Sequence, residues 1–274
     1  MSVFYNDISP DACLWLNKLI GCGLIDEGNV LKLSITSLDA DFCNKFNQCH
    51  FFCGIGGWPY ALNLAGVPLD WNVWTGSCPC QPFSAANKDA KGFDDERDLW
   101  KDFFRLIKGG KPDFVFGEQV PTAASNGWLD RLCTDLQSEG YIVLASILSA
   151  SLVGAPHYRK RLYWGGVRAE VLDNPKMFRQ EWKRSVGYPS WGTGEKQVCS
   201  EELRDCGPTF WSNAERLRGT EGKAFCMEPG MFPLANGVPN RMVKSVGYGN
   251  AIVPQVGALF VSSFFDTIFE DKAI

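Results

Sequence analysis

The sequence predicts an α/β protein, in which helices cover a mostly parallel sheet and a small region is inserted before the last helix. Strand-like and helix-like runs alternate up to about residue 165, as they do in parallel sheets with helical crossovers. Between about 168 and 239 glycine, proline, tryptophan and charge replace this periodicity. Regular apolar spacing returns in GNAIVPQVGALFVSSFFDTIF, residues 249–269, and predicts a helix that rejoins the core.

The individual elements follow in chain order. Strand-like runs are expected at 3–7, 30–35, 49–54, 71–76, 112–118 and 141–150. Helical runs are expected at 12–20, 58–66, 99–107 and 126–139. In the third of these, Leu99, Trp100, Phe103, Phe104 and Ile107 recur at the spacing of one helix face.

Composition limits the class of protein. A chain of 274 residues that is 45% hydrophobic and 21% charged forms one large domain, or one domain with a small insert. No apolar run approaches the roughly 18 residues of a membrane span. MSVFYNDISPDA has no basic segment of the kind that opens a signal peptide, so a cytoplasmic protein is expected.

Cysteine and charge exclude several function classes. Eleven cysteines in a chain of this length suggest reduced thiols, and two histidines with no second close cysteine pair argue against zinc. The net charge of −4 argues against a general polyanion binder. From Arg159 to Arg184, however, eight basic residues face three acidic ones, which suits either a solvated loop or a local basic surface.

Two loops follow strands that lie close in sequence. FFCGIGG, residues 51–57, suits a cofactor loop or a tight turn, because glycine lets the backbone approach a ligand. GSCPCQPFSAANK, residues 76–88, follows the next strand, and so it should lie at the same sheet edge. A cysteine in it is either a nucleophile or a buried structural thiol.

Charged residues are expected at that edge too. Glu118 ends the strand PDFVFGE, and is either an acid with a raised pKa or a salt-bridged glutamate. Arg159 and Arg161 in HYRKR alternate along a strand entry, where they suit an anionic group or plain surface charge.

In chain order, FFCGIGG, PCQPFS, EQV, HYRKR and GYGNAIVPQVG resemble the motifs of the cytosine-5 DNA methyltransferases, phage or prophage members above all. The resemblance implies a Rossmann-like class I methyltransferase sheet with a small inserted target-recognition domain. Residues 1–167, completed by 240–274, would form the catalytic domain that binds S-adenosylmethionine. Residues 168–239 would form the recognition region.

The resemblance also implies catalytic roles. Cys80 matches the nucleophile that adds to carbon 6 of cytosine, and Cys78 is a bystander. Glu118 matches the acid that bonds nitrogen 3 of the ring and its amine. Arg159 and Arg161 match the arginines of the family's QxRxR motif.

Ligand contacts are implied in the same way. The residues expected to bind the cofactor are Phe52, Cys53, Gly54, Ile55, Gly56, Gly57, Asn250 and Ala251. The residues expected to bind DNA are Gln81, Ser84, Lys183 and Arg184.

The implied function is methylation of carbon 5 of cytosine in double-stranded DNA by a monomer, through a covalent cysteine adduct and base flipping. The recognition sequence, and any restriction enzyme acting with the chain, stay open. So do three other readings: a tRNA methyltransferase on the same motifs, an inactive DNA-binding relative, and a nucleotide-level enzyme such as thymidylate synthase.

Three features depart from the family. Gln119 replaces the usual asparagine of ENV, and His157 replaces the glutamine of QxRxR. Cys80 follows Gly57 by 23 positions, and the stretch between them holds only one helix and one strand, fewer than the family places there. We therefore expect a permuted motif order, in which the first 50 residues supply the missing units.

In that permuted order, VFYND supplies Asp7 for the cofactor ribose, with Ile8 at the position of the adenine-stacking side chain. Ser34 stands where the family often has an aspartate for the adenine amine. A simpler alternative is that Asp7 only caps the helix that starts near Pro10.

Overall fold

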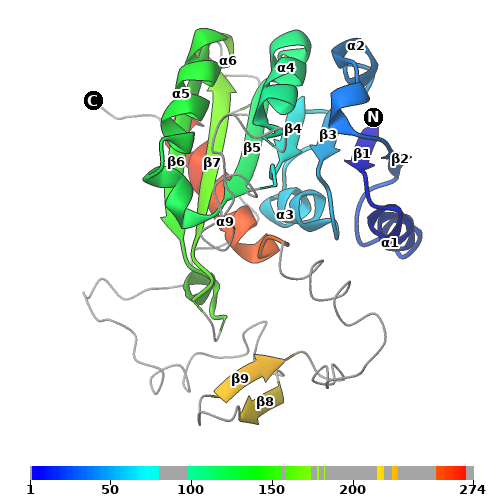
Figure 1. The fold of residues 1–274 in the computed structure, drawn as a ribbon, viewed down its shortest axis with the longest axis vertical. Helices are drawn as coiled ribbons and strands as arrows, with labels where there is room; N and C mark the ends of the chain where they lie inside the picture. Colours follow the sequence, from blue (N-terminus) through cyan, green and yellow to red (C-terminus); the bar gives the residue numbers. More distant parts are fainter. Residues whose placement is uncertain are drawn as a thin grey trace.

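The computed structural model describes residues 2–79, 98–155, 158–173, 178, 182, 215–218, 224–227 and 251–269. Within these ranges the chain forms a seven-stranded sheet of order β2-β1-β3-β4-β5-β7-β6 and a two-stranded sheet, β8-β9 (Figure 1). The larger sheet confirms the predicted α/β, Rossmann-like class.

The strands of the larger sheet are β1 (Val3–Asp7), β2 (Gly28–Lys32), β3 (Gln48–Phe51), β4 (Val73–Gly76), β5 (Phe114–Gln119), β6 (Tyr141–Leu148) and β7 (Arg161–Arg168). The helices are α1 (Pro10–Gly21), α2 (Ala40–Cys43), α3 (Gly57–Ala65), α4 (Trp100–Gly110), α5 (Trp128–Ser138), α6 (Ala169–Asp173) and α9 (Pro254–Phe269). Short 3₁₀ turns are η1 (Ile35–Ser37), η4 (Pro121–Ala124) and η5 (Ala150–Val153). The smaller sheet pairs β8 (Glu215–Arg218) with β9 (Ala224–Met227) in antiparallel fashion.

The first strand lies inside the sheet, between β2 and β3. It runs parallel to both, with Val3 opposite Gly28 on one side and opposite Gln48 on the other. The strand that ends in Asp7 therefore neighbours the strand that leads into FFCGIGG, although it precedes it in the chain. This is the adjacency that the permuted arrangement requires.

The remaining strands extend the sheet from β3. Strands β3, β4 and β5 are parallel neighbours. Strand β7 is antiparallel to both β5 and β6, between which it lies. Because parallel strands share a direction, the carboxyl ends of β1, β3, β4 and β5 meet at one edge, and antiparallel β7 begins there.

Alternate side chains of each strand point to opposite faces, and each face is covered by its own helices. Tyr5 on β1 packs with α1, whereas Val73 on β4 and Phe116 on β5 pack with α3 and α9. Phe4 and Trp74 point to the other face, where they pack with α2, α4 and α5. The result is a helical layer on each side of the sheet.

Local hydrogen bonds explain where one expected strand ends. The run at 30–35 was expected to be one strand, but β2 ends at Lys32 and a 3₁₀ turn follows. The Ser34 hydroxyl accepts from the Thr36 amide at 3.4 Å and caps that turn. A short polar side chain thus offers the backbone an alternative to the sheet.

The chain after β7 still packs against the core. Val171 and Phe178 are buried in the cluster that contains α3 and α9. Trp182 donates its indole N–H to Asp266 on α9 at 3.0 Å, and its ring centroid lies 4.8 Å from that of Phe265. The first part of the expected recognition region is therefore attached to the sheet layer. None of the helices in the described ranges has the length and apolar character that a bilayer crossing requires.

Candidate active site

The glycine loop leaves β3 through left-handed backbone conformations. Phe52, Gly54 and Gly56 have φ values of 50°, 55° and 81°. A Cβ at Gly56 would lie 2.8 Å from Leu19 Cδ1, which would have to shift, and the left-handed backbone there disfavours any residue with a Cβ. A Cβ at Gly54 would meet only the Phe52 carbonyl oxygen, at 4.0 Å, so space is open beside its backbone.

Asp7 lies next to this loop at the end of β1. Its Oδ2 accepts from the Gly54 amide at 2.8 Å and its Oδ1 from the Ser9 amide at 2.8 Å. The N-cap of α1 is Ser9, whose hydroxyl accepts from Ala12. Asp7 is therefore not simply a helix cap, because one of its oxygens holds the glycine loop in place.

Two other predicted cofactor residues flank Asp7. Ile8 is 71% exposed, which is unusual for an isoleucine directly beside a buried strand. Ser34 is half-buried and its hydroxyl lies 2.8 Å from the Thr36 hydroxyl, in addition to its bond with the Thr36 amide. Ile8 offers an open apolar surface, whereas Ser34 is already engaged locally.

Glu118 occupies the end of β5 at the same edge. Its side chain is buried, and the Arg161 Nε lies 2.8 Å from its Oε1 in an ion pair that is not a well-aligned hydrogen bond. Burial raises the pKa of the Glu118 carboxyl to about 7, although Arg161 and Arg159 both act to lower it. Near neutral pH this group can hold a proton and donate it.

The two predicted arginines have different partners. Arg161, at the start of β7, faces Glu118, whereas the Arg159 Nη2 donates to the Ala251 carbonyl at 2.6 Å. The strand neighbour Tyr163 accepts from the Val253 amide. The segment that begins at Ala251 is thus held against β7.

The same segment also reaches the glycine loop. A Cβ at Gly57, the first residue of α3, would lie 2.7 Å from Ile252 Cγ1. Residues 251–257, the described part of GNAIVPQVG, therefore contact both the start of α3 after the glycine loop and Arg159.

Cys78 is a structural thiol. It is buried, and burial together with the nearby Asp98 carboxylate raises the pKa of the thiol well above its usual value. A thiol in this environment stays protonated and is a poor nucleophile. Six of the predicted site positions lie outside the described residues: Cys80, Gln81, Ser84, Lys183, Arg184 and Asn250. His157 lies outside them too.

Sequence reasoning missed a link between the two halves of the site. Trp58, in the first turn of α3, donates its indole N–H to the Ser77 hydroxyl at 2.9 Å. The same oxygen accepts from the Glu118 amide at 3.2 Å. The signal in the sequence is slight: a serine placed directly after a buried strand and before a buried cysteine.

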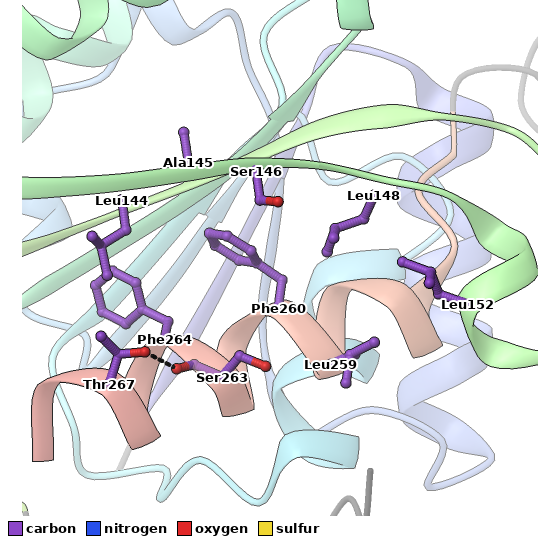
Figure 2. Close-up of a pocket in the computed structure, with 10 residues that line it drawn as sticks. All are labelled: Leu144, Ala145, Ser146, Leu148, Leu152, Leu259, Phe260, Ser263, Phe264 and Thr267. Carbon is purple, nitrogen blue, oxygen red and sulfur yellow. Dashed lines mark hydrogen bonds between the residues drawn. The ribbon is translucent and has the colours of Figure 1, made fainter. Parts of the chain in front are cut away.

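A cavity of about 350 Å³ lies elsewhere, between β6, η5 and α9 (Figure 2). Its walls are mostly apolar, and Leu144, Leu148, Phe260 and Phe264 contribute to them. The Thr267 hydroxyl on its rim is bonded to the Ser263 carbonyl at 2.7 Å. Among the residues that the structure describes, no charged side chain lines it, so these walls offer no chemistry comparable to that of the sheet edge. Within the described ranges, no three His, Cys, Asp or Glu side chains gather as metal ligands would.

Residues 63–186 match the family model described as C-5 cytosine-specific DNA methylase. The Type II methyltransferase M.HgiDI of Herpetosiphon aurantiacus is 36% identical over 106 residues, 38% of this chain and 34% of that protein. M.HhaI of Haemophilus parahaemolyticus is 36% identical over 37% of this chain and 32% of that protein. M.NgoPII of Neisseria gonorrhoeae is 31% identical over 55% of this chain and 46% of that protein. The matched segments thus span less than half of these relatives.

Solved structures show a partial likeness. A mutant of Spodoptera frugiperda DNMT2 is 18% identical, with a TM-score of 0.41 over 60% of this chain and 42% of that one. The Entamoeba histolytica methyltransferase EhMeth is 20% identical, with a TM-score of 0.43 over 60% of this chain and 44% of that one.

Proposed function

We propose, from the premise that this chain belongs to the C-5 cytosine-specific DNA methylase family, that it methylates carbon 5 of cytosine in double-stranded DNA. The methyl donor of the family is S-adenosylmethionine. The observation that carries the proposal is the buried Glu118 carboxyl, whose pKa is raised to about 7, at the edge shared with the glycine loop.

The residues present fit S-adenosylmethionine. Open space beside Gly54 admits a ligand against the backbone, and the Asp7 carboxylate beside it keeps acceptor sites for a ribose diol. The exposed Ile8 offers an apolar surface to an adenine ring. When bound, this cofactor supplies an electrophilic methyl group on a positively charged sulfur.

Glu118 and Cys80 would carry the chemistry on the base. The Cys80 thiolate adds to carbon 6 of cytosine, and the Glu118 carboxyl gives its proton to nitrogen 3 as that bond forms. Carbon 5 then becomes nucleophilic and takes up the methyl group. Loss of the carbon 5 proton to water breaks the bond between sulfur and carbon 6, and nitrogen 3 returns its proton to Glu118.

The arginines support this chemistry electrostatically. A free cysteine has a pKa of about 8.5, so the thiolate form must be favoured by neighbouring positive charge. Arg161 and Arg159 place two guanidinium groups at the edge where PCQPFS begins. Arg161 also keeps Glu118 oriented in its ion pair. The target base must leave the stack to reach these groups, at a cost of about a few kcal/mol.

The strand order supports a permuted arrangement of motifs. Asp7 comes before the glycine loop in the chain, yet its strand pairs with β3 and its carboxylate bonds Gly54. We place the ribose contact on Asp7 for this reason. Ser34 stays the candidate for the adenine amine.

DNA recognition would reside in residues 168–239, acting in a monomer. Trp182 of this region packs on α9 and would attach the region to the catalytic layers. Lys183 and Arg184 directly follow Trp182 in sequence, and we propose that they bind phosphate groups of the DNA backbone. The β8–β9 hairpin belongs to the same region.

The test of the function is bisulfite sequencing of DNA from cells that express the chain, compared with cells that express Cys80→Ala. We expect cytosines protected within one sequence context, and none with the variant. Cys78→Ala should keep most of the protection, because that thiol is buried and protonated. Unprotected DNA together with methylated RNA would assign the activity to RNA instead.

A further inference from the structure

Strand β4 ends where its backbone packs closely against that of β5. Its parallel pairing with β5 runs from Val73 opposite Phe114 to Thr75 opposite Phe116. One residue further, a Cβ at Gly117 would lie 2.5 Å from the Gly76 carbonyl oxygen. The two backbones are thus in close contact where β4 ends at Gly76, and Cys80 follows four residues later.

Side chains continue the link between the two chain segments beyond that point. The Glu118 amide donates to the Ser77 hydroxyl at 3.2 Å. The Gln119 Nε2 then donates to the Cys78 carbonyl at 3.2 Å. These two bonds fix residues 77 and 78 against residues 118 and 119, beyond the last backbone pair of the two strands.

The Gln119 side chain makes one further hydrogen bond in the part of the chain that the structure describes. It is 3% exposed, and its Oε1 accepts from the Val120 amide at 3.0 Å. Both ends of a buried amide are therefore used, one on its own strand and one on the segment that leads to the nucleophile. A carbonyl two residues from Cys80 is held by the residue next to Glu118.

We propose that Gln119 is a positioning residue, which sets where the Cys80 segment starts relative to the Glu118 carboxyl. The inference rests on the proposed function. Two residues of chain span at most about 7 Å, so fixing the Cys78 carbonyl limits where the Cys80 backbone can lie. Nucleophile and acid must reach neighbouring atoms of one cytosine ring, so their relative placement affects the rate directly.

The experiment measures covalent trapping. Long duplex DNA synthesised with 5-fluorocytosine in place of cytosine presents many sequence contexts and stops the reaction at the adduct, because fluorine cannot leave as a proton does. The trapping rate at saturating S-adenosylmethionine is compared for the wild type and Gln119→Met, which keeps the side-chain length and loses both hydrogen bonds. Gln137→Met, on the exposed face of α5, is the matched control.

We expect Gln119→Met to trap about 10- to 100-fold more slowly, the scale of a small misplacement of reacting groups. Its affinity for S-adenosylmethionine should stay within about twofold of wild type, because the Asp7 and Gly54 contacts are untouched. Gln137→Met should trap at the wild-type rate. A Gln119→Met protein that traps as fast as the wild type would overturn the inference.

A second variant keeps the test decisive if Gln119→Met fails to fold. Gln119→Glu has the same shape, and only its protonated form can donate to the Cys78 carbonyl. Its trapping rate relative to wild type should therefore recover as the pH falls, and a ratio that does not change with pH overturns the inference. A wild-type protein that never traps would instead refute the proposed function itself.

Discussion

Asp7 and Glu118 are both carboxylates at the carboxyl end of a parallel strand, yet their surroundings differ. Asp7 is half-buried and accepts hydrogen bonds from two backbone amides, those of Ser9 and Gly54. Glu118 is buried, and its Oε1 faces the Arg161 guanidinium. Amide donors suit a carboxylate that accepts bonds from a diol, whereas burial suits one that carries a proton.

The comparison teaches that position along a strand does not decide the role of a carboxyl group. Both residues share the sheet edge, and burial is the main cause that raises the pKa of Glu118 to about 7. In the proposed function, the β1 end of the edge binds the cofactor and the β5 end exchanges a proton. Four predictions test this division.

The largest effect is expected for Glu118→Gln. The amide cannot deliver a proton to nitrogen 3, so the single-turnover rate of methyl transfer should fall by about 10²- to 10⁴-fold, the usual contribution of a general acid. The affinity for S-adenosylmethionine should equal that of wild type, because the substitution leaves Asp7 and its contacts unchanged. Rapid-quench assays with saturating DNA measure the rate.

Glu139→Gln is the matched control for this variant. Glu139 follows α5 and pairs with Lys108 at 2.6 Å, so the substitution removes an ion pair outside the proposed site. Its rate should equal that of wild type. If Glu118→Gln also keeps the full rate, Glu118 is not the acid.

The second prediction concerns the pH dependence of stability. The folded protein binds the Glu118 proton more tightly than the unfolded chain, because the pKa is raised from 4.5 to about 7. This contribution is complete below the unfolded pKa and is lost as the pH rises through 7. Between pH 5 and 8 the free energy of unfolding of wild type should fall by about 2–3 kcal/mol more than that of Glu118→Gln.

Urea unfolding of both proteins at the two pH values measures this difference. The comparison cancels all other titrating groups, provided that the substitution leaves their surroundings intact. Equal pH dependence in the two proteins would show that the carboxyl titrates normally, and the division between the two ends of the edge would then lose its physical basis.

The third prediction tests the binding end. Asp7→Ala should weaken S-adenosylmethionine binding by about 1.5–3 kcal/mol, the scale of hydrogen bonds to a charged group. Calorimetric titration measures it. Asp39→Ala is the control, because Asp39 is exposed and makes no side-chain cap bond at the start of α2. Unchanged affinity in a folded Asp7→Ala protein would remove Asp7 from the site, together with the proposed permuted order.

Much of this division could be predicted from the sequence. The alternating runs predicted the strands, and the acidic residue that ends VFYND predicted the position of Asp7 beside the glycine loop. Motif spacing placed Glu118 at the same edge. Strand ends and residue types are local properties, so a single sequence carries them.

Partners between distant segments could not be predicted. Arg159 and Arg161 alternate on one segment, and the sequence suggested the same role for both, either binding of an anionic group or plain surface charge. One pairs with Glu118 and the other with the Ala251 carbonyl, 92 residues away. The same holds for the bond between Trp58 and Ser77. Such contacts depend on which strands become neighbours, and that is fixed only when the whole sheet assembles.

The smallest effect is expected at Ser34, within the binding end itself. Its hydroxyl already accepts from the Thr36 amide and lies 2.8 Å from the Thr36 hydroxyl, so little capacity remains for an adenine amine. Ser34→Ala should therefore lower S-adenosylmethionine affinity by less than about fivefold, below the loss of a full hydrogen bond. It should cost about 0.5–1 kcal/mol of stability through the lost cap.

Calorimetric titration and urea unfolding of the same preparation separate the two effects of Ser34→Ala. Thr36→Val serves as a partial control, because it removes the hydroxyl partner and keeps the amide bond to Ser34. A loss of affinity as large as that of Asp7→Ala would mean that Ser34 gives up its local bonds to hold the adenine. Two side chains, Asp7 and Ser34, would then bind the cofactor, and the comparison of one binding carboxylate with one buried acid would no longer describe the site.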